Sequence, residues 1–313
     1  MNYLKHLKFS PPVFHQCVLV TVIALATMLI NPPATGEEPA PQPPLTSTLA
    51  FHLATNLVGR VAGHPPDYKY KVELDAPYSM RLTHYGRASW SDTFWLKGIK
   101  GLSATPIGYR DQMSGQGLMT MVSPRHYLCA THMHPEGRSI AFLDTNNVIH
   151  WRNSLAQRVD VGGDTTVGIL DADVPPSVGF LPVLPDDFTN YLPTGTNVIQ
   201  GIGMNQDMYL FGQPMRFISD TVIAWNVNQA APFGLSTNWN IKLRGGDSSN
   251  PEMILVGNQL VLVSHNFTAG SGPNYARQIS AINRAMHELS TNNQVQTDYQ
   301  LTEFSLTNWP VIH

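Results

Sequence analysis

The sequence predicts an all-β protein built from two six-stranded antiparallel barrels, with a helix at the C-terminal end. Short apolar runs alternate with turn residues from about position 103 onward. Gly and Pro number 24 each, which suits many short strands joined by turns. Residues 274–290 carry apolar side chains at helical spacing. Hydrophobic residues make up 42% of the chain, so its composition is that of a folded protein rather than a disordered one.

The strands fall into two sets, separated by a Pro-rich crossing at 174–193. A tight turn at 145–147 divides the first set, and Gly257-Asn258 turns the last pair of the second. The first set comprises 103–109, 115–123, 126–131, 139–144, 148–160 and 165–170. The second set comprises 196–202, 207–211, 215–227, 238–244, 251–256 and 259–265. The C-terminal helix is predicted from the spacing of Ile279, Ile282, Met286 and Leu289.

The first 34 residues have the features of a signal peptide. Lys5 and Lys8 form a basic start, and an apolar stretch follows over residues 17–30. This stretch is shorter than the roughly 20 residues that span a membrane. Counted back to Val13 it is longer, so an uncleaved membrane anchor is the alternative. The protein is therefore expected to be exported, either secreted or held in the periplasm or cell envelope, and to meet a membrane only through such an anchor.

Four further regions follow the signal segment. Residues 35–47 form a Pro-rich linker, and residues 48–102 form an N-terminal extension. An amphipathic helix is predicted over 46–60, where the linker meets the extension. Residues 103–290 hold the two-barrel domain, and 291–313 form a C-terminal tail.

Charge and cysteine content exclude some classes of protein. A net charge of −3 offers no basic surface for nucleic acid. Cys17 lies in the apolar N-terminal stretch, so Cys129 is the one cysteine left in an exported chain and cannot form an internal disulfide. Cys129 lies on a predicted strand three residues before His132, where we expect a buried, unreactive thiol rather than a nucleophile.

A candidate nucleophile lies in the loop Gly245-Gly246-Asp247-Ser248-Ser249-Asn250-Pro251. A serine hydroxyl needs a neighbouring base and an oxyanion site to act as a nucleophile. Glycine two residues before Ser248 lets backbone N–H groups turn toward one point. The N–H groups of Gly246 and Ser248 are therefore candidates for an oxyanion hole. The same pattern also occurs in plain surface turns.

A candidate base lies upstream. An apolar strand, a Ser123-Pro124-Arg125 turn and a second strand lead into Cys129-Ala130-Thr131-His132. This stretch resembles the chymotrypsin-like (trypsin-type) serine peptidases, in which T-A-A-H carries the catalytic histidine. The G-D-S-G-G-P box of that family is similar to residues 246–251, with Ser249 and Asn250 in place of two glycines. The hairpin at 252–266 resembles the strands that line the family's substrate pocket.

The resemblance implies a catalytic triad of His132, Asp164 and Ser248. The family places its carboxylate just before a short apolar strand, where Asp164 precedes residues 165–170. Asp160 and Asp171 are the rival carboxylates. In this arrangement the carboxylate holds the Nδ1 proton of the histidine, so that Nε2 can take the proton of the serine.

The resemblance also implies a substrate pocket and a mode of activation. The residue six before the serine, here Lys242, often lies at the pocket base, and Ser264 and His265 would lie at its wall. A cation there would favour an acidic side chain before the scissile bond. No Ile-Val-Gly-Gly-like start precedes residue 103, so Asp247 should be satisfied by groups within the folded chain, without proteolytic activation.

The predicted function is that of an exported serine endopeptidase acting on protein or peptide substrates through an acyl-enzyme, without a metal or organic cofactor. Two alternatives come from other classes. One is an inactive two-barrel module that binds peptides or envelope components. The other is a zinc hydrolase, because His132 and His134 would point to one side of a strand.

Overall fold

The computed structural model describes residues 47–64, 75–78, 88–110, 117–224, 229–268 and 270–312. The predicted signal peptide or anchor lies outside these ranges. Residues Pro43–His313 form one compact unit. Within the ranges described, no helix is both long and apolar enough to cross a membrane.

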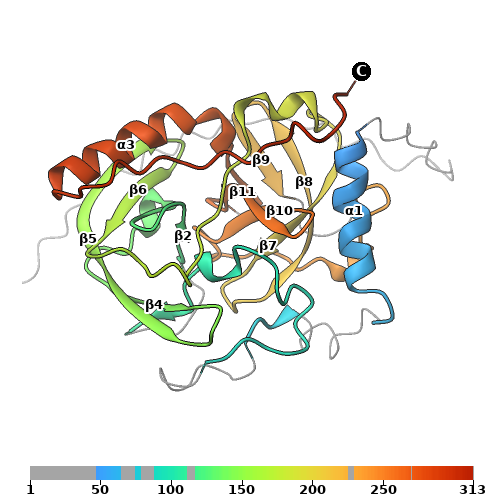
Figure 1. Cartoon of the computed structure of the whole chain (residues 1–313). Coiled ribbons are helices and arrows are strands. Elements are labelled where there is room, and N and C mark those ends of the chain that lie inside the picture. The colour runs from blue at the N-terminus through green and yellow to red at the C-terminus, as the bar shows by residue number, and fades with distance from the viewer. Residues whose placement is uncertain are drawn as a thin grey trace, which may run out of the picture. The chain divides into compact units, whose positions relative to one another are not determined.

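The fold is all-β, with two six-stranded antiparallel sheets and a C-terminal helix, as the sequence predicts (Figure 1). The first sheet has the strand order β1-β4-β5-β6-β3-β2. Its strands are β1 (Gly108–Tyr109), β2 (Thr120–Met121), β3 (His126–Ala130), β4 (Ser139–Leu143), β5 (Ile149–Gly162) and β6 (Thr165–Leu170). Strand β3 pairs with β6 over its whole length, from His126 opposite Ile169 to Ala130 opposite Thr165.

The second sheet has the strand order β11-β10-β7-β8-β9-β12. Its strands are β7 (Ile199–Met204), β8 (Leu210–Ile218), β9 (Thr221–Ala224), β10 (Pro251–Val256), β11 (Gln259–His265) and β12 (Ser271–Pro273). The hairpin of β10 and β11 turns at Gly257 and contains a register shift between Glu252 and Met253.

Several predicted strands are corrected by the structure. The predicted strand 103–109 is mostly the 3₁₀ turn η1 (Leu102–Ala104) and its exit, because β1 holds only two residues. The predicted strands 207–211 and 215–227 are one long strand, β8, and its hairpin partner β9. The predicted strand 238–244 is instead the 3₁₀ turn η4 (Thr237–Trp239) followed by a loop. The sixth strand of the second sheet is β12, which the sequence did not indicate.

Two α-helices in the described ranges cover the sheets. Helix α1 (Thr48–Arg60) begins at Ser47, whose Oγ accepts a hydrogen bond from Ala50 N at 3.0 Å. Its buried face packs against β7 and β10. Helix α3 (Ile279–Asn292) packs against β5 and β6, two inner strands of the first sheet, and lies above them in Figure 1. Both helices match the apolar spacing in the sequence.

The larger hydrophobic core joins the two sheets. Tyr127 and Phe142 enter it from the first sheet, and Leu255 and Leu262 enter it from the second. Residues before β1, among them Trp95, belong to the same core. A second core lies between α1 and the second sheet. Because one core is shared, the ends of strands from both sheets are held at fixed positions relative to each other.

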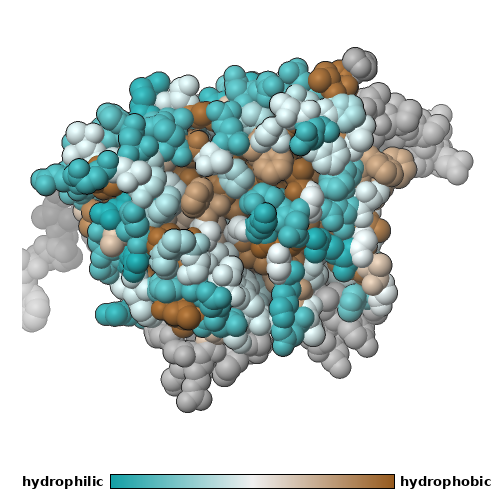
Figure 2. Space-filling model, in the orientation of Figure 1, coloured by the Kyte–Doolittle hydropathy of each residue, from teal (hydrophilic) through white to brown (hydrophobic). Residues whose placement is uncertain are grey.

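The face of the molecule drawn in Figure 2 is largely hydrophilic, with smaller apolar areas between polar ones. Exposed apolar side chains of the described part include Phe51 and Phe233, whose rings meet at 5.3 Å between centroids. A single pair of exposed aromatic rings is a small apolar area, and such areas are common on folded proteins.

Candidate active site

His132 and Asp164 are brought together by the pairing of β3 with β6. The chain leaves β3 at Ala130 and enters the 3₁₀ turn η2 (Thr131–Met133), which carries His132. Asp164 lies in the turn that enters β6 and has φ +58°. Thr131 N donates to the backbone oxygen of Asp164 at 2.9 Å, which fixes the two turns side by side.

The side chains then meet directly. His132 Nδ1 lies 2.7 Å from Asp164 Oδ2, and His132 N donates to Asp164 Oδ1 at 3.4 Å. The His132 side chain is 48% exposed and that of Asp164 is 23% exposed, so the ring can meet a substrate while its carboxylate partner is more sheltered. This is the arrangement in which a carboxylate fixes the imidazole tautomer and leaves Nε2 free.

The two rival carboxylates are engaged elsewhere. Asp160 accepts from the hydroxyl of Thr166 and lies near Arg158, with 3.7 Å between Oδ1 and Nε. Asp171 accepts from Asn153 N at 2.9 Å and from Asn153 Nδ2 at 2.6 Å. Of the three carboxylates that the sequence offered, Asp164 is the one that contacts the ring of His132.

The candidate nucleophile lies in the loop that leads into β10. Ser248 is half-buried, whereas its neighbour Ser249 is fully buried. Ser249 Oγ accepts a hydrogen bond of 2.7 Å from Ala130 N, two residues before His132. The loop is thus held beside the segment that carries the histidine. In the described part of the chain, no hydrogen bond joins Ser248 Oγ to His132 Nε2, a contact that often tightens only when substrate binds.

The backbone of this loop turns at Gly246, one of the two candidates for an oxyanion hole. Gly246 has φ +98°, a conformation that glycine adopts readily. Neither Gly246 N nor Ser248 N donates to another residue in the ranges described. Both N–H groups are therefore available to a developing negative charge at a substrate.

Asp247 is satisfied within the folded chain, and this prediction is confirmed. Its carboxylate is fully buried and accepts from Gln206 N at 2.6 Å and from Arg244 N at 2.5 Å. Burial raises the pKa of Asp247, while these two backbone N–H groups act in the opposite direction. These bonds anchor the loop to Gln206 and Arg244, in addition to the bond that Ser249 makes with Ala130.

The three predicted pocket residues differ in exposure to solvent, because one is exposed and two are buried. Lys242 is exposed. Ser264 is fully buried and donates to the backbone oxygen of His265 at 3.1 Å. His265 is 1% exposed, its Nδ1 meets the hydroxyl of Tyr275, and burial lowers its pKa to about 3. A cationic role for His265 at neutral pH therefore does not fit, because its ring is buried and uncharged.

His132 and His134 do not lie on one strand, as the zinc-hydrolase alternative requires. Residues 131–133 form a 3₁₀ turn rather than a strand, so strand alternation does not apply to His132 and His134. His134 Nε2 lies 3.0 Å from the hydroxyl of Tyr127, and burial lowers the pKa of His134 to about 4. Within the ranges described, no three His, Cys, Asp or Glu side chains are grouped to hold a metal ion.

Cys129 is fully buried on β3. Burial raises the pKa of its thiol well above the ordinary value, so little thiolate forms near neutral pH. This placement matches the expected unreactive thiol.

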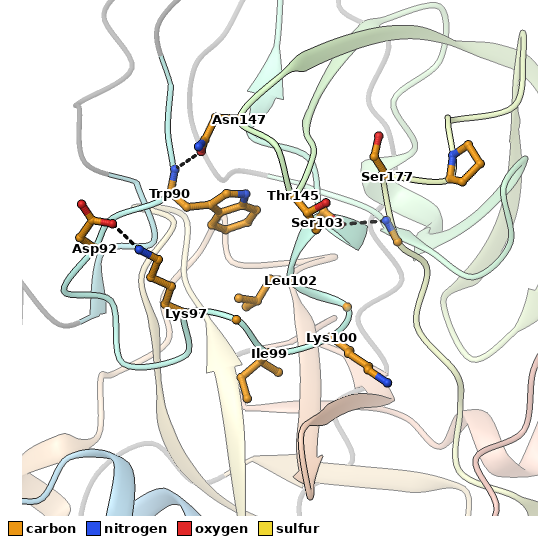
Figure 3. Close-up of a pocket in the computed structure, with 14 residues that line it drawn as sticks. Trp90, Asp92, Lys97, Ile99, Lys100, Leu102, Ser103, Thr145, Asn147 and Ser177 are labelled. Atoms are coloured by element: carbon orange, nitrogen blue, oxygen red, sulfur yellow. Dashed lines mark hydrogen bonds and ion pairs between the residues drawn. The ribbon is translucent and has the colours of Figure 1, made fainter.

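One hollow of the described structure adjoins the candidate site, and a larger one lies elsewhere. A cavity of about 240 Å³ adjoins His132 and is also lined by Tyr109, Glu136 and Arg138. A larger cavity of about 430 Å³ lies where residues 90–103 meet the turn at 145–147 and the crossing segment at 176–179 (Figure 3). Its lining includes Trp90 and Leu102 but none of the three predicted triad residues. The sequence did not predict it.

A scan against protein-family models finds no match, and a search of curated proteins finds no significant relative.

Proposed function

We propose that this protein is an exported serine endopeptidase that cleaves peptide bonds through an acyl-enzyme on Ser248. The observation that carries the proposal is the His132–Asp164 pair, with 2.7 Å between Nδ1 and Oδ2. Beside it lies the loop of Ser248, in which the N–H groups of Gly246 and Ser248 donate no hydrogen bond to another described residue. Export is proposed from the apolar stretch near the N-terminus.

In the proposed mechanism, Asp164 keeps the proton of His132 on Nδ1. Nε2 then takes the proton of Ser248 as Oγ attacks the substrate carbonyl, and the resulting oxyanion is bound by the N–H groups of Gly246 and Ser248. His132 next gives this proton to the leaving amine, and the C–N bond breaks. A water molecule then gives a proton to the same Nε2 and attacks the acyl-enzyme. The ester C–O bond breaks, His132 returns the proton to Ser248 Oγ, and the new carboxyl end of the substrate is released.

For substrate preference, Lys242 remains the candidate cation, because it is exposed whereas His265 is buried and neutral. A charge-assisted hydrogen bond from its ammonium group would favour an acidic residue before the scissile bond.

A second candidate function is an inactive binding module with the same fold. It is favoured by the lack of a hydrogen bond between Ser248 Oγ and His132 Nε2 among the residues described. In this case the loop would keep its shape without performing acyl transfer.

Labelling with a fluorophosphonate probe separates these functions. The protease should be labelled at Ser248, and labelling should disappear in Ser248→Ala and His132→Ala. A metal chelator should leave labelling unchanged, whereas a zinc hydrolase would not be labelled at Ser248 and would lose its activity with the chelator. Folded wild-type chain that resists the probe would favour the inactive module.

A further inference from the structure

Ser249 occupies an unusual position behind the candidate nucleophile. It is fully buried and has φ +72°, a backbone conformation that side chains other than glycine adopt with strain. Glycine would remove that strain. A serine in this position therefore calls for a compensating interaction of its hydroxyl group.

The hydroxyl has such an interaction, and it joins the two sheets. Ser249 Oγ accepts from Ala130 N of the first sheet at 2.7 Å. Ser249 N donates to the backbone oxygen of Asn266, directly after β11 of the second sheet, at 2.7 Å. Asn266 N in turn donates to the backbone oxygen of Asn250 at 3.0 Å. The residue after Ser248 is thus fastened to both sheets.

The bond to Ala130 is made close to the histidine. Ala130 ends β3, is paired with Thr165 of β6, and precedes His132 by two residues. Thr165 directly follows Asp164 in the chain. One hydroxyl therefore links the loop of Ser248 to the strand pair that holds His132 and Asp164, although Ser249 itself is buried behind the candidate nucleophile.

We propose that Ser249 is a positioning residue whose hydroxyl sets the separation between Ser248 and His132. This inference rests on the proposed peptidase function. A small displacement of reacting groups can lower a rate by about a hundredfold. Loss of the bond should therefore lower kcat and the rate of fluorophosphonate labelling about ten- to a hundredfold, with little change in KM, because Ser249 touches no substrate.

The decisive variant is Ser249→Gly. Glycine suits φ +72°, so the variant should unfold at a temperature no lower than an alanine variant at this site. If Ser249 only filled space in a strained turn, glycine would leave kcat unchanged. If the hydroxyl positions the loop, Ser249→Gly and Ser249→Ala should both lose activity.

A matched control is Ser103→Ala. Ser103 is also buried, and its Oγ accepts from Gly179 N at 2.8 Å, at the larger cavity rather than at the triad (Figure 3). This variant loses the same kind of bond and should keep the labelling rate of wild type.

The outcomes are distinguishable. The inference is supported if wild type is labelled, Ser249→Gly is labelled more slowly than wild type, and Ser103→Ala is labelled at the wild-type rate. Wild type and Ser249→Gly labelled at equal rates would overturn the inference alone. A folded wild type that is not labelled would overturn the proposed function, and with it a catalytic positioning role for Ser249.

Discussion

Glu252 provides a quantitative test of how the second sheet is packed. It lies on β10, four residues after Ser248, and is 2% exposed. It is paired in register with Gly203 of β7 and Ser264 of β11. Neither of its carboxyl oxygens has a hydrogen-bond partner within the ranges described. Burial without a partner raises the pKa of Glu252 to about 8.

The sign of the pH effect follows from this shift. The folded chain keeps a proton on Glu252 that the unfolded chain releases above the ordinary pKa of 4.5. The free energy of unfolding should therefore fall as pH rises from about 4.5 to about 8 and level off above that range. Each pKa unit between the unfolded and the folded state corresponds to about 1.4 kcal/mol. The shift of Glu252 from 4.5 to about 8 therefore lowers the free energy of unfolding by on the order of 5 kcal/mol across this pH range.

Two buried histidines act in the opposite direction at lower pH. Burial lowers the pKa of His126 to about 4 and that of His265 to about 3. The unfolded chain binds protons on both below pH 6.5, so their contribution to stability grows as pH rises toward that value. The wild-type chain should then be most stable near pH 6.5.

The perturbation is Glu252→Gln, which keeps the shape of the side chain and removes its titration. Urea unfolding between pH 5 and pH 9 should show that the variant gains stability relative to wild type as pH rises, and that it lacks the decline above pH 6.5. Glu288→Gln, at an exposed position on α3, is the control and should follow the wild-type curve. Parallel curves for wild type and Glu252→Gln would refute the account of an unpartnered buried carboxyl.

Two further predictions concern the site. Asp164→Asn should lower kcat about 10³- to 10⁴-fold in a peptide assay, because the amide cannot hold the Nδ1 proton in the same way. The control Asp160→Asn should keep a kcat near that of wild type. A reversal of the two results would assign the role of the triad carboxylate to Asp160. Cys129 should react with iodoacetamide only as the chain unfolds, because its thiol is buried and its pKa is raised. Fast alkylation of Cys129 itself in the folded chain, located by peptide mass spectrometry, would show that the thiol is accessible.

Much of the fold could be predicted because most strands are short apolar runs bounded by turn residues. Strands β6, β10 and β11 match the predicted ranges, and all three are almost entirely buried. The boundary between β8 and β9 was missed because the turn there uses Ser219 at φ +50° rather than a glycine. Strand β12 was missed because Gly272 and Pro273 disfavour strands when judged by composition.

The contact between Asp164 and His132 could be anticipated from the sequence through the family resemblance. The resemblance places a carboxylate directly before an apolar strand, with Asp160 and Asp171 as rivals, and Asp164 is the one that meets the ring of His132. The bond from Ala130 to Ser249 was not predictable, because it joins residues 119 positions apart. The burial of His265 was also missed, since it depends on packing against Tyr275 rather than on alternation along β11.

If Ser248 is the nucleophile, a fluorophosphonate probe should form its covalent adduct on this residue. After reaction with the folded chain, digestion and mass spectrometry should find one adduct per chain on the peptide that contains Ser248. His132→Ala should reduce the adduct to background while the chain remains folded. An adduct on another residue, or none on a folded wild-type chain, would contradict the claim.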